Sequence, residues 1–206
     1  MPQTKNIIFD LGGVLLNINY NKTLQAFKEL GYTNFDEMYS QYTADALFED
    51  LETGRVSADD FYNKLLKGKE AHITEPQLAH AWNNMLLDFR TNSLQFLKEL
   101  AKDYQIFLLS NTNEIHLTAF DEILKAQTGL QSIDGFFKKA YYSHRVNLRK
   151  PNKNIFEFVL QDAGIAAEET LFIDDSWNNI ETAAAMGFKT HLLLPGETIE
   201  QLNYRA

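Results

Sequence analysis

The segment "NIIFDLGGVLLNI", residues 6–18, is an apolar run that contains one carboxylate, Asp10, followed by Gly12 and Gly13. The apolar residues before Asp10 are typical of a strand buried inside a sheet. Glycines allow a backbone to approach a ligand closely and to adopt positive φ angles. We therefore expect a buried strand that ends at Asp10 and a bare turn that leaves space beside this carboxylate.

The composition of the chain predicts a folded protein without a membrane span. Its 206 residues are 45% hydrophobic, with 15 Phe and 9 Tyr, which is sufficient for a packed interior. The absence of cysteine excludes disulfides and thiolate zinc sites. The N-terminal apolar run carries a charge and is shorter than the roughly 20 residues that a membrane span needs. We expect a cytoplasmic protein that has no membrane partner.

The net charge of the chain is −9. Affinity for the phosphate backbone of nucleic acids comes from clustered Lys and Arg, and such clusters are not evident, so we expect no nucleic-acid partner. Small phosphorylated ligands remain compatible with this charge, because local cations or a metal ion can reverse the field inside one pocket. The sequence does not indicate an oligomeric state.

Short apolar runs alternate with helical patterns in the second half of the chain. The predicted strands cover residues 105–110, 139–143, 170–175 and 190–194, and the predicted helices lie near 113–126, 152–163 and 177–186. Such alternation is typical of a mainly parallel sheet with helices on both faces. The sequence thus predicts an α/β fold with a doubly wound, Rossmann-like sheet.

The region between the first strand and Gln105 contains helical patterns and no comparable apolar strand. One predicted helix begins at Ser57 and ends at Gly68, and another begins at Thr74 within "TEPQLAHAWNNMLLDF". We interpret this region as a helical cap inserted into the α/β core. The predicted division is a core of residues 1–16 and 89–206 and a cap of residues 17–88.

Functional side chains follow the predicted strands at the points where they end. Ligands bind open parallel sheets at the carboxyl ends of the strands, beside the topological switch point. If the fold is correct, three carboxylates, a hydroxyl, an amide and a lysine converge at this edge. These side chains belong to Asp10, Ser110, Asn111, Lys150, Asp174 and Asp175.

This set of groups suits phosphoryl transfer. A carboxylate such as Asp10 can attack phosphorus and form an aspartyl-phosphate. Attack of one anion on another requires a divalent cation between them, and paired carboxylates with backbone carbonyls and waters are the ligands that Mg²⁺ prefers. Lys150 can neutralise the nucleophile and the phosphoryl group, and Ser110 can donate to phosphoryl oxygens.

Four segments, "FDLGGVL", "LLSNTN", "RKPNKNIF" and "FIDDSWNNI", resemble in order and spacing the motifs of the haloacid dehalogenase-like hydrolase superfamily. The predicted insertion resembles the C1 cap of that family, and the branch with similar first motifs includes phosphatases of glucose 1-phosphate. The resemblance implies Asp10 as nucleophile and Lys150 as the charge-organising cation. It implies Mg²⁺ bound by Asp10, the Gly12 carbonyl and Asp175, with Asp174 contributing through water. It implies phosphate binding by Ser110 and Asn111 beside the turn formed by Gly12 and Gly13.

The chain departs from this family at Gly12, where most of its phosphatases carry an Asp that serves as general acid and base. Such catalysis contributes about 10²- to 10⁴-fold to the rate. Three explanations are open: a substrate with a good leaving group, such as an anomeric or acyl phosphate; a proton from water or from the cap carboxylates Glu49, Asp50 and Glu52; or phosphate binding without turnover.

A Mg²⁺-dependent phosphatase of a small phosphorylated metabolite is the function that the sequence favours. The alternatives are a phosphate-binding or interaction protein with impaired catalysis and, less favoured, a haloacid dehalogenase. A dehalogenase needs no metal, so the adjacent Asp174 and Asp175 would then have no explanation.

Overall fold

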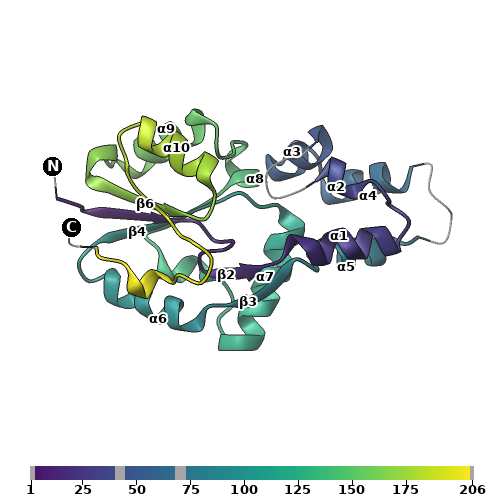
Figure 1. Ribbon diagram of the computed structural model, residues 1–206, viewed down its shortest axis with the longest axis horizontal. Coiled ribbons are helices and arrows are strands. Elements are labelled where there is room, and N and C mark those ends of the chain that lie inside the picture. Colours follow the sequence, from purple (N-terminus) through teal and green to yellow (C-terminus); the bar gives the residue numbers. More distant parts are fainter. Residues whose placement is uncertain (1–2, 40–44, 68–72, 205–206) are drawn as a thin grey trace.

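A computed structural model describes residues 3–39, 45–67 and 73–204 of the chain. Its main sheet has five parallel strands in the order β5-β4-β1-β6-β7, with β1 at the centre (Figure 1). The strands in this order are Lys139–Tyr142, Gln105–Ser110, Asn6–Phe9, Thr170–Asp174 and Lys189–Leu192. The chain leaves β1 toward β4 and later crosses to β6, which makes the end of β1 the topological switch point.

Helices cover both faces of this sheet, which confirms the predicted α/β class. Helices α6 (Thr91–Leu100) and α7 (Glu114–Thr128) lie on one face, and α9 (Lys153–Ala163) and α10 (Trp177–Ala185) lie on the other (Figure 1). Alternate residues of β1 pack on opposite faces of the sheet. Ile7 belongs to the hydrophobic core under α6 and α7, and Ile8 belongs to the core under α9 and α10.

A helical unit extends beyond the carboxyl edge of the sheet (Figure 1). It contains α1 (Tyr20–Glu29), α2 (Phe35–Met38), α3 (Ala46–Glu52), α4 (Ala58–Leu66) and α5 (Glu75–Asn83). The unit has its own hydrophobic core, in which Phe48 and Trp82 are completely buried. Helices begin at the predicted Ser57 and Thr74 caps, whereas the predicted helix end at Gly68 lies outside the described residues.

Two short antiparallel strands, β2 (Leu16–Ile18) and β3 (Leu86–Phe89), connect the helical unit to the sheet. They correct the expectation that this region contains only helices, because the helix that begins after Thr74 ends at Asn83 and "LLDF" becomes a strand. A short apolar run has no periodicity that separates helix from strand. Pairing with β2 decides its conformation, and the Gln127 side chain accepts a hydrogen bond from the Phe89 N–H.

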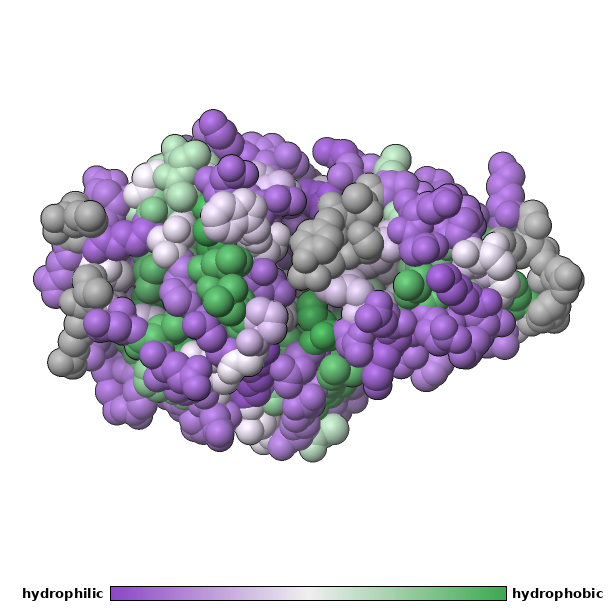
Figure 2. Space-filling view, in the orientation of Figure 1, coloured by the Kyte–Doolittle hydropathy of each residue, from purple (hydrophilic) through white to green (hydrophobic). Residues whose placement is uncertain are grey.

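The remaining elements are short. The segment after β5 forms α8 (Ser143–Val146), and three 3₁₀ turns cover Ile133–Phe136, Ala167–Glu169 and Ile199–Gln201. Hydrophilic side chains cover most of the face seen in Figure 2. Within the described residues, none of the helices combines the length and the apolar character that crossing a membrane requires.

His116 joins the helical unit to the sheet. Its ring stacks on Trp82 at 4.6 Å, and its Nε2 lies 3.2 Å from the Trp82 carbonyl oxygen. The Nδ1 atom lies 3.2 Å from the Asn113 amide nitrogen, so a neutral ring with its proton on Nε2 satisfies both contacts. Burial lowers the pKa of His116 to about 4, with the Trp82 carbonyl acting in the opposite direction.

This low pKa predicts a loss of stability in acid. Between pH 6.5 and 4, His116 is protonated in the unfolded chain and neutral in the folded chain. The free energy of unfolding therefore falls as the pH decreases. The contribution reaches about 3 kcal/mol at 1.36 kcal/mol per pKa unit. Urea unfolding of the wild type and of His116→Gln at several pH values measures it. The wild type should lose more stability than the variant over this range, and parallel pH profiles would contradict the assignment.

Candidate active site

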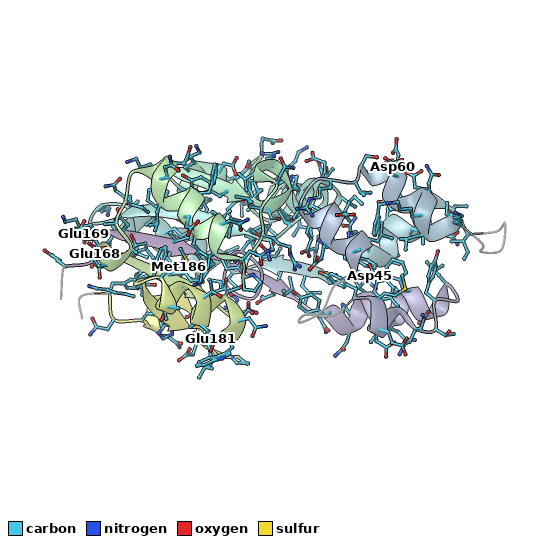
Figure 3. All side chains as sticks on the ribbon, turned by 90° about the horizontal axis from the view of Figure 1, so that it is seen from above. Asp45, Asp60, Glu168, Glu169, Glu181 and Met186 are labelled. Atoms are coloured by element: carbon cyan, nitrogen blue, oxygen red, sulfur yellow. The ribbon has the colours of Figure 1, made fainter. Side chains whose placement is uncertain are left out.

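The site lies at the carboxyl edge of the sheet, where β1 and β6 end side by side. Phe9 pairs with Ile173, so the next residues along the two strands, Asp10 and Asp174, are level with each other. In Figure 3, Glu168 and Glu169, which precede β6, lie at the end of the molecule farthest from the helical unit. The carboxylates therefore occupy the opposite edge of the sheet, which faces the helical unit.

Lys150 lies between these carboxylates. Its Nζ is 2.7 Å from Oδ1 of Asp10 and 2.7 Å from Oδ2 of Asp174, and the lysine is only 1% exposed. Burial opposes the charge of Lys150, but the two carboxylates outweigh this effect and raise its pKa. The Asn111 side chain fixes the lysine backbone by accepting from its N–H at 2.9 Å and donating to its carbonyl at 2.8 Å.

Asp174 is completely buried, and both of its oxygens accept hydrogen bonds. In addition to Lys150, its donors are the Ser176 N–H at 2.8 Å and the Asn179 amide, which lies 3.0 and 3.1 Å from the two oxygens. A carboxylate held in this way is well suited to position Lys150. Its bond from the Ser176 N–H also fixes the backbone at the residue that precedes α10.

Asp10, Asp174 and Asp175 form a compact group in which one ligand atom from each residue lies within 4.8 Å of the others. Burial raises the pKa of Asp10 to about 7 against the opposing effect of Lys150, and the two other carboxylates add to the rise. Burial and the Asp174 charge raise the pKa of Asp175 to about 6. Such crowding of carboxylates beside one lysine leaves excess negative charge that a hard divalent cation neutralises.

The glycine turn shapes the space beside Asp10. Gly13 has φ +72°, and a Cβ atom at this position would lie 2.2 Å from Oδ2 of Asp175. A Cβ atom at Gly12 would meet only the flexible end of Ile18, at 3.0 Å. Gly13 is therefore required both by its backbone conformation and by the position of Asp175.

A cavity of about 520 Å³ separates this edge from the helical unit, and residues of both line it. From the sheet side come six of the predicted site residues: Asp10, Gly12, Ser110, Asn111, Lys150 and Asp175. From the helical unit come Tyr20, Tyr39, Glu49 and Glu52. This volume suits a small-molecule ligand.

Arg149 lines the cavity and connects the sheet side to helix α3 of the helical unit. It pairs through Nη1 with Glu49 at 2.7 Å and through Nη2 with Glu52 at 2.9 Å. Glu52 also accepts from the Tyr39 hydroxyl at 3.3 Å. Burial raises the pKa of Glu52, while Arg149 and Tyr39 act in the opposite direction.

The structure brings the predicted residues together. The contacts of Asn111 and the burial of Ser110 bear on their expected roles as phosphate ligands. Both polar ends of the Asn111 side chain are engaged by Lys150, so its phosphate contact stays a prediction. Ser110 is buried at the end of β4 and lines the cavity, and its role as a phosphate ligand also stays a prediction.

Three further residues, Tyr20, Arg149 and Asn179, contribute to the site or its surroundings but were not predicted from the sequence. Tyr20 begins the first helix of the insertion, and Arg149 and Asn179 stand within the motif segments around Lys150 and Asp174. Only the last two carried a signal, which was their place inside those segments. His144 and Arg145, which follow β5, belong to the short helix α8.

Comparison with known proteins gives consistent matches over nearly the whole chain. A family model described as haloacid dehalogenase-like hydrolase matches residues 4–187. The D-ribitol-5-phosphate phosphatase of Bacteroides thetaiotaomicron is 34% identical over 188 residues, which cover 90% of each chain.

Two similar solved structures extend these matches. A point mutant of a haloacid dehalogenase family enzyme of Bacteroides thetaiotaomicron, in complex with magnesium and inorganic phosphate, has a TM-score of 0.86 and 32% identity, covering 95% of this chain and 96% of that one. A predicted haloacid dehalogenase-like family hydrolase of Porphyromonas gingivalis has a TM-score of 0.85 and 36% identity, covering 95% and 94% of the two chains.

The glycine turn provides a test of the site geometry by stability. Gly13→Ala should lower the free energy of unfolding by about 2 kcal/mol, because it combines a strained positive φ with a clash against Asp175. Gly12→Ala, its matched control, should cost less than about 1 kcal/mol, because only the end of Ile18 must move. Urea unfolding measures both values, and equal losses in the two variants would contradict the described turn.

Proposed function

The chain belongs to the haloacid dehalogenase-like hydrolase family, and from this premise we propose that it is a Mg²⁺-dependent phosphatase of a small phosphorylated metabolite. The observation that carries the proposal is that Asp10, Lys150 and Asp175 line one cavity, while the fully buried Asp174 pairs with Lys150. The ribitol-phosphate phosphatase and the magnesium- and phosphate-bound enzyme among its relatives support the same chemistry.

We assign the metal site to Asp10, Asp175 and the Gly12 carbonyl. The close approach of Gly13 to Asp175 and the crowding of the carboxylates fit a hard oxygen-seeking cation. The oxygens of Asp174 already accept from Lys150, Ser176 and Asn179, so in this proposal its contact with the metal runs through water. When bound, Mg²⁺ reduces the repulsion between the carboxylates and the phosphate dianion.

In the proposed mechanism Asp10 is the nucleophile. A carboxylate oxygen of Asp10 attacks phosphorus, the bond from phosphorus to the ester oxygen breaks, and that oxygen takes up a proton. A water molecule then attacks the same phosphorus, loses a proton, and releases inorganic phosphate and the free carboxylate. Lys150 keeps Oδ1 of Asp10 in place at 2.7 Å and offsets negative charge in both steps.

Ser110 and the backbone N–H of Gly12 are the proposed donors to the phosphoryl oxygens, because the Gly13 N–H already donates to the Leu16 carbonyl at 2.8 Å. Ser110 lines the cavity from the end of the strand adjacent to β1. Asn111 has a positioning role in this scheme, because its side chain holds the backbone of Lys150. These donors act on charge that develops during transfer, which is where preorganised hydrogen bonds contribute most.

We propose that residues 17–88 act as a cap over the phosphate site, with β2 and β3 forming its connection to the sheet. Tyr20, Tyr39 and Glu52 of this segment line the cavity opposite the carboxylates. The part of the substrate that leaves with the ester oxygen would therefore contact the cap. Hydrophilic groups at this wall favour a hydroxylated leaving group such as a sugar or polyol.

Gly12 favours a second candidate, a protein that binds phosphate esters without hydrolysing them. Gly12 offers no acid for the leaving group, and such an acid contributes about 10²- to 10⁴-fold. In the phosphatase proposal water or a substrate with a good leaving group compensates for this absence. Turnover separates the two candidates directly.

A generic aryl phosphate, p-nitrophenyl phosphate, is the first substrate to test. We expect hydrolysis that requires Mg²⁺ and stops when EDTA removes it, because the carboxylates and the phosphate dianion repel each other. Asp10→Asn should reduce the rate by at least about 10³-fold, since it removes the nucleophile. Asp162→Asn is the matched control, because Asp162 pairs with Lys139 on the outer edge of the sheet and should leave the rate unchanged.

Hydrolysis by Asp10→Asn at the wild-type rate would overturn the assignment of the nucleophile. Mg²⁺-dependent binding of phosphate esters without any hydrolysis by the wild type would instead favour the second candidate. Calorimetric titration with the same esters measures that binding.

A further inference from the structure

Glu52 is a buried carboxylate that the proposed phosphoryl transfer does not use. It ends helix α3, is 6% exposed, and lines the cavity on the wall opposite Asp10. An ionised carboxylate in such a place is costly unless a partner or a ligand compensates for its lost hydration. Because Glu52 lines the cavity, contact with a bound ligand is one way in which its buried charge could be compensated.

Glu52 accepts one hydrogen bond and forms one ion pair, which are the contacts of an ionised carboxylate. One oxygen accepts from the Tyr39 hydroxyl, and the other lies 2.9 Å from Nη2 of Arg149. Arg149 also pairs with Glu49, so two carboxylates share one guanidinium. This wall therefore carries one more negative charge than positive charge.

Docking of α3 against the sheet has other contacts besides the pairing of Glu52 with Arg149. Asn147 donates to the Thr53 carbonyl at 2.7 Å, and Gly54 approaches the His144 carbonyl so closely that a Cβ atom would lie 2.2 Å from its oxygen. These backbone contacts join α3 to α8 independently of Glu52. Removal of the Glu52 charge would leave these contacts in place, and Arg149 would keep Glu49 as its paired carboxylate.

We propose, building on the phosphatase function, that Glu52, Arg149 and Tyr39 form the subsite for the leaving group and select an uncharged polyhydroxy group over one that carries a second anion. Hydroxyls both donate and accept, so a polyol can donate to Glu52 and accept from Arg149 or Tyr39. A carboxylate or second phosphate would face the excess negative charge of Glu49 and Glu52 inside the cavity. Specificity then comes from a repulsive element as well as an attractive one.

The experiment compares kcat/KM for a pentitol monophosphate and for 3-phosphoglycerate, which carries a carboxylate on its leaving group. The wild type should prefer the pentitol ester. Glu52→Gln keeps the side-chain shape and removes the charge, so the ratio of the two kcat/KM values should fall by about tenfold. Glu49→Gln should change the ratio in the same direction by less, because Glu49 is half-exposed.

Asp50→Asn is the matched control. Asp50 lies on the same helix α3, carries the same charge and pairs with Arg55 at 3.6 Å rather than with Arg149, so the ratio should stay at its wild-type value. A purely structural role for Glu52 would lower both kcat/KM values together and leave the ratio unchanged. That outcome would overturn the proposal, as would a wild-type preference for 3-phosphoglycerate.

Failure of the proposed function gives a different result. If the wild type hydrolyses no phosphate ester, including the aryl phosphate, the phosphatase proposal is wrong, whatever the role of Glu52. The ratio of the Kd values of the two esters, measured by calorimetry with Mg²⁺ for the wild type and Glu52→Gln, then tests the subsite without turnover. A ratio that Glu52→Gln leaves unchanged would overturn the subsite.

Discussion

The ammonium group of Lys150, held 2.7 Å from both Asp10 and Asp174, is the interaction on which the rest of the site depends. Burying a lysine and two carboxylates costs several kcal/mol per ion unless the geometry and the surrounding hydrogen bonds are favourable. The structure meets this condition from four separate segments of the chain. Asn111 holds the backbone of Lys150, and Asn179 and the Ser176 N–H satisfy Asp174. The parallel register of β1 and β6 brings the two carboxylates to the same level.

The carboxylates remain in excess over the lysine, and this imbalance gives the site its function. A site with one cation and three acids attracts a divalent ion, and the proposed nucleophile can approach a phosphate dianion only with such an ion present. The opposite wall of the cavity also carries excess negative charge, because one Arg149 guanidinium pairs with both Glu49 and Glu52. No metal site is proposed at this wall, so its negative charge repels an anionic group. One end of the cavity thus suits an anion through its metal, while the other disfavours a second anion.

Much of this arrangement follows from the sequence. The strands of the main sheet are short apolar runs bounded by Gly, Pro or charged residues, and their alternation with amphipathic helices leaves few possible topologies. The carboxyl ends of these strands then place Asp10, Ser110 and Asp174 at one edge without any structural information. Strand pairing was harder to predict for "LLDF", because only its contact with Leu16–Ile18 makes it a strand.

The cavity wall that is formed by Arg149, Glu52 and Tyr39 could not be predicted from the sequence, because it too depends on contacts between distant segments. Arg149, Glu52 and Tyr39 meet only because two separately packed units face each other, and no periodicity in either unit encodes the angle between them. Their types alone would suit exposed positions. One of the three explanations that the sequence left open for Gly12 was a proton from cap carboxylates such as Glu52, and this role stays a prediction, while the structure places Glu52 in contact with Tyr39 and Arg149.

The central claim is that Asp10 itself carries the phosphoryl group, and mass spectrometry of acid-quenched enzyme tests it most directly. Wild-type protein mixed with Mg²⁺ and excess substrate, quenched during turnover and digested, should yield a peptide containing Asp10 with the added mass of one phosphoryl group. Asp10→Asn treated in the same way should yield only the unmodified peptide. A phosphoryl group on a residue other than Asp10, or steady hydrolysis by Asp10→Asn, would contradict the account.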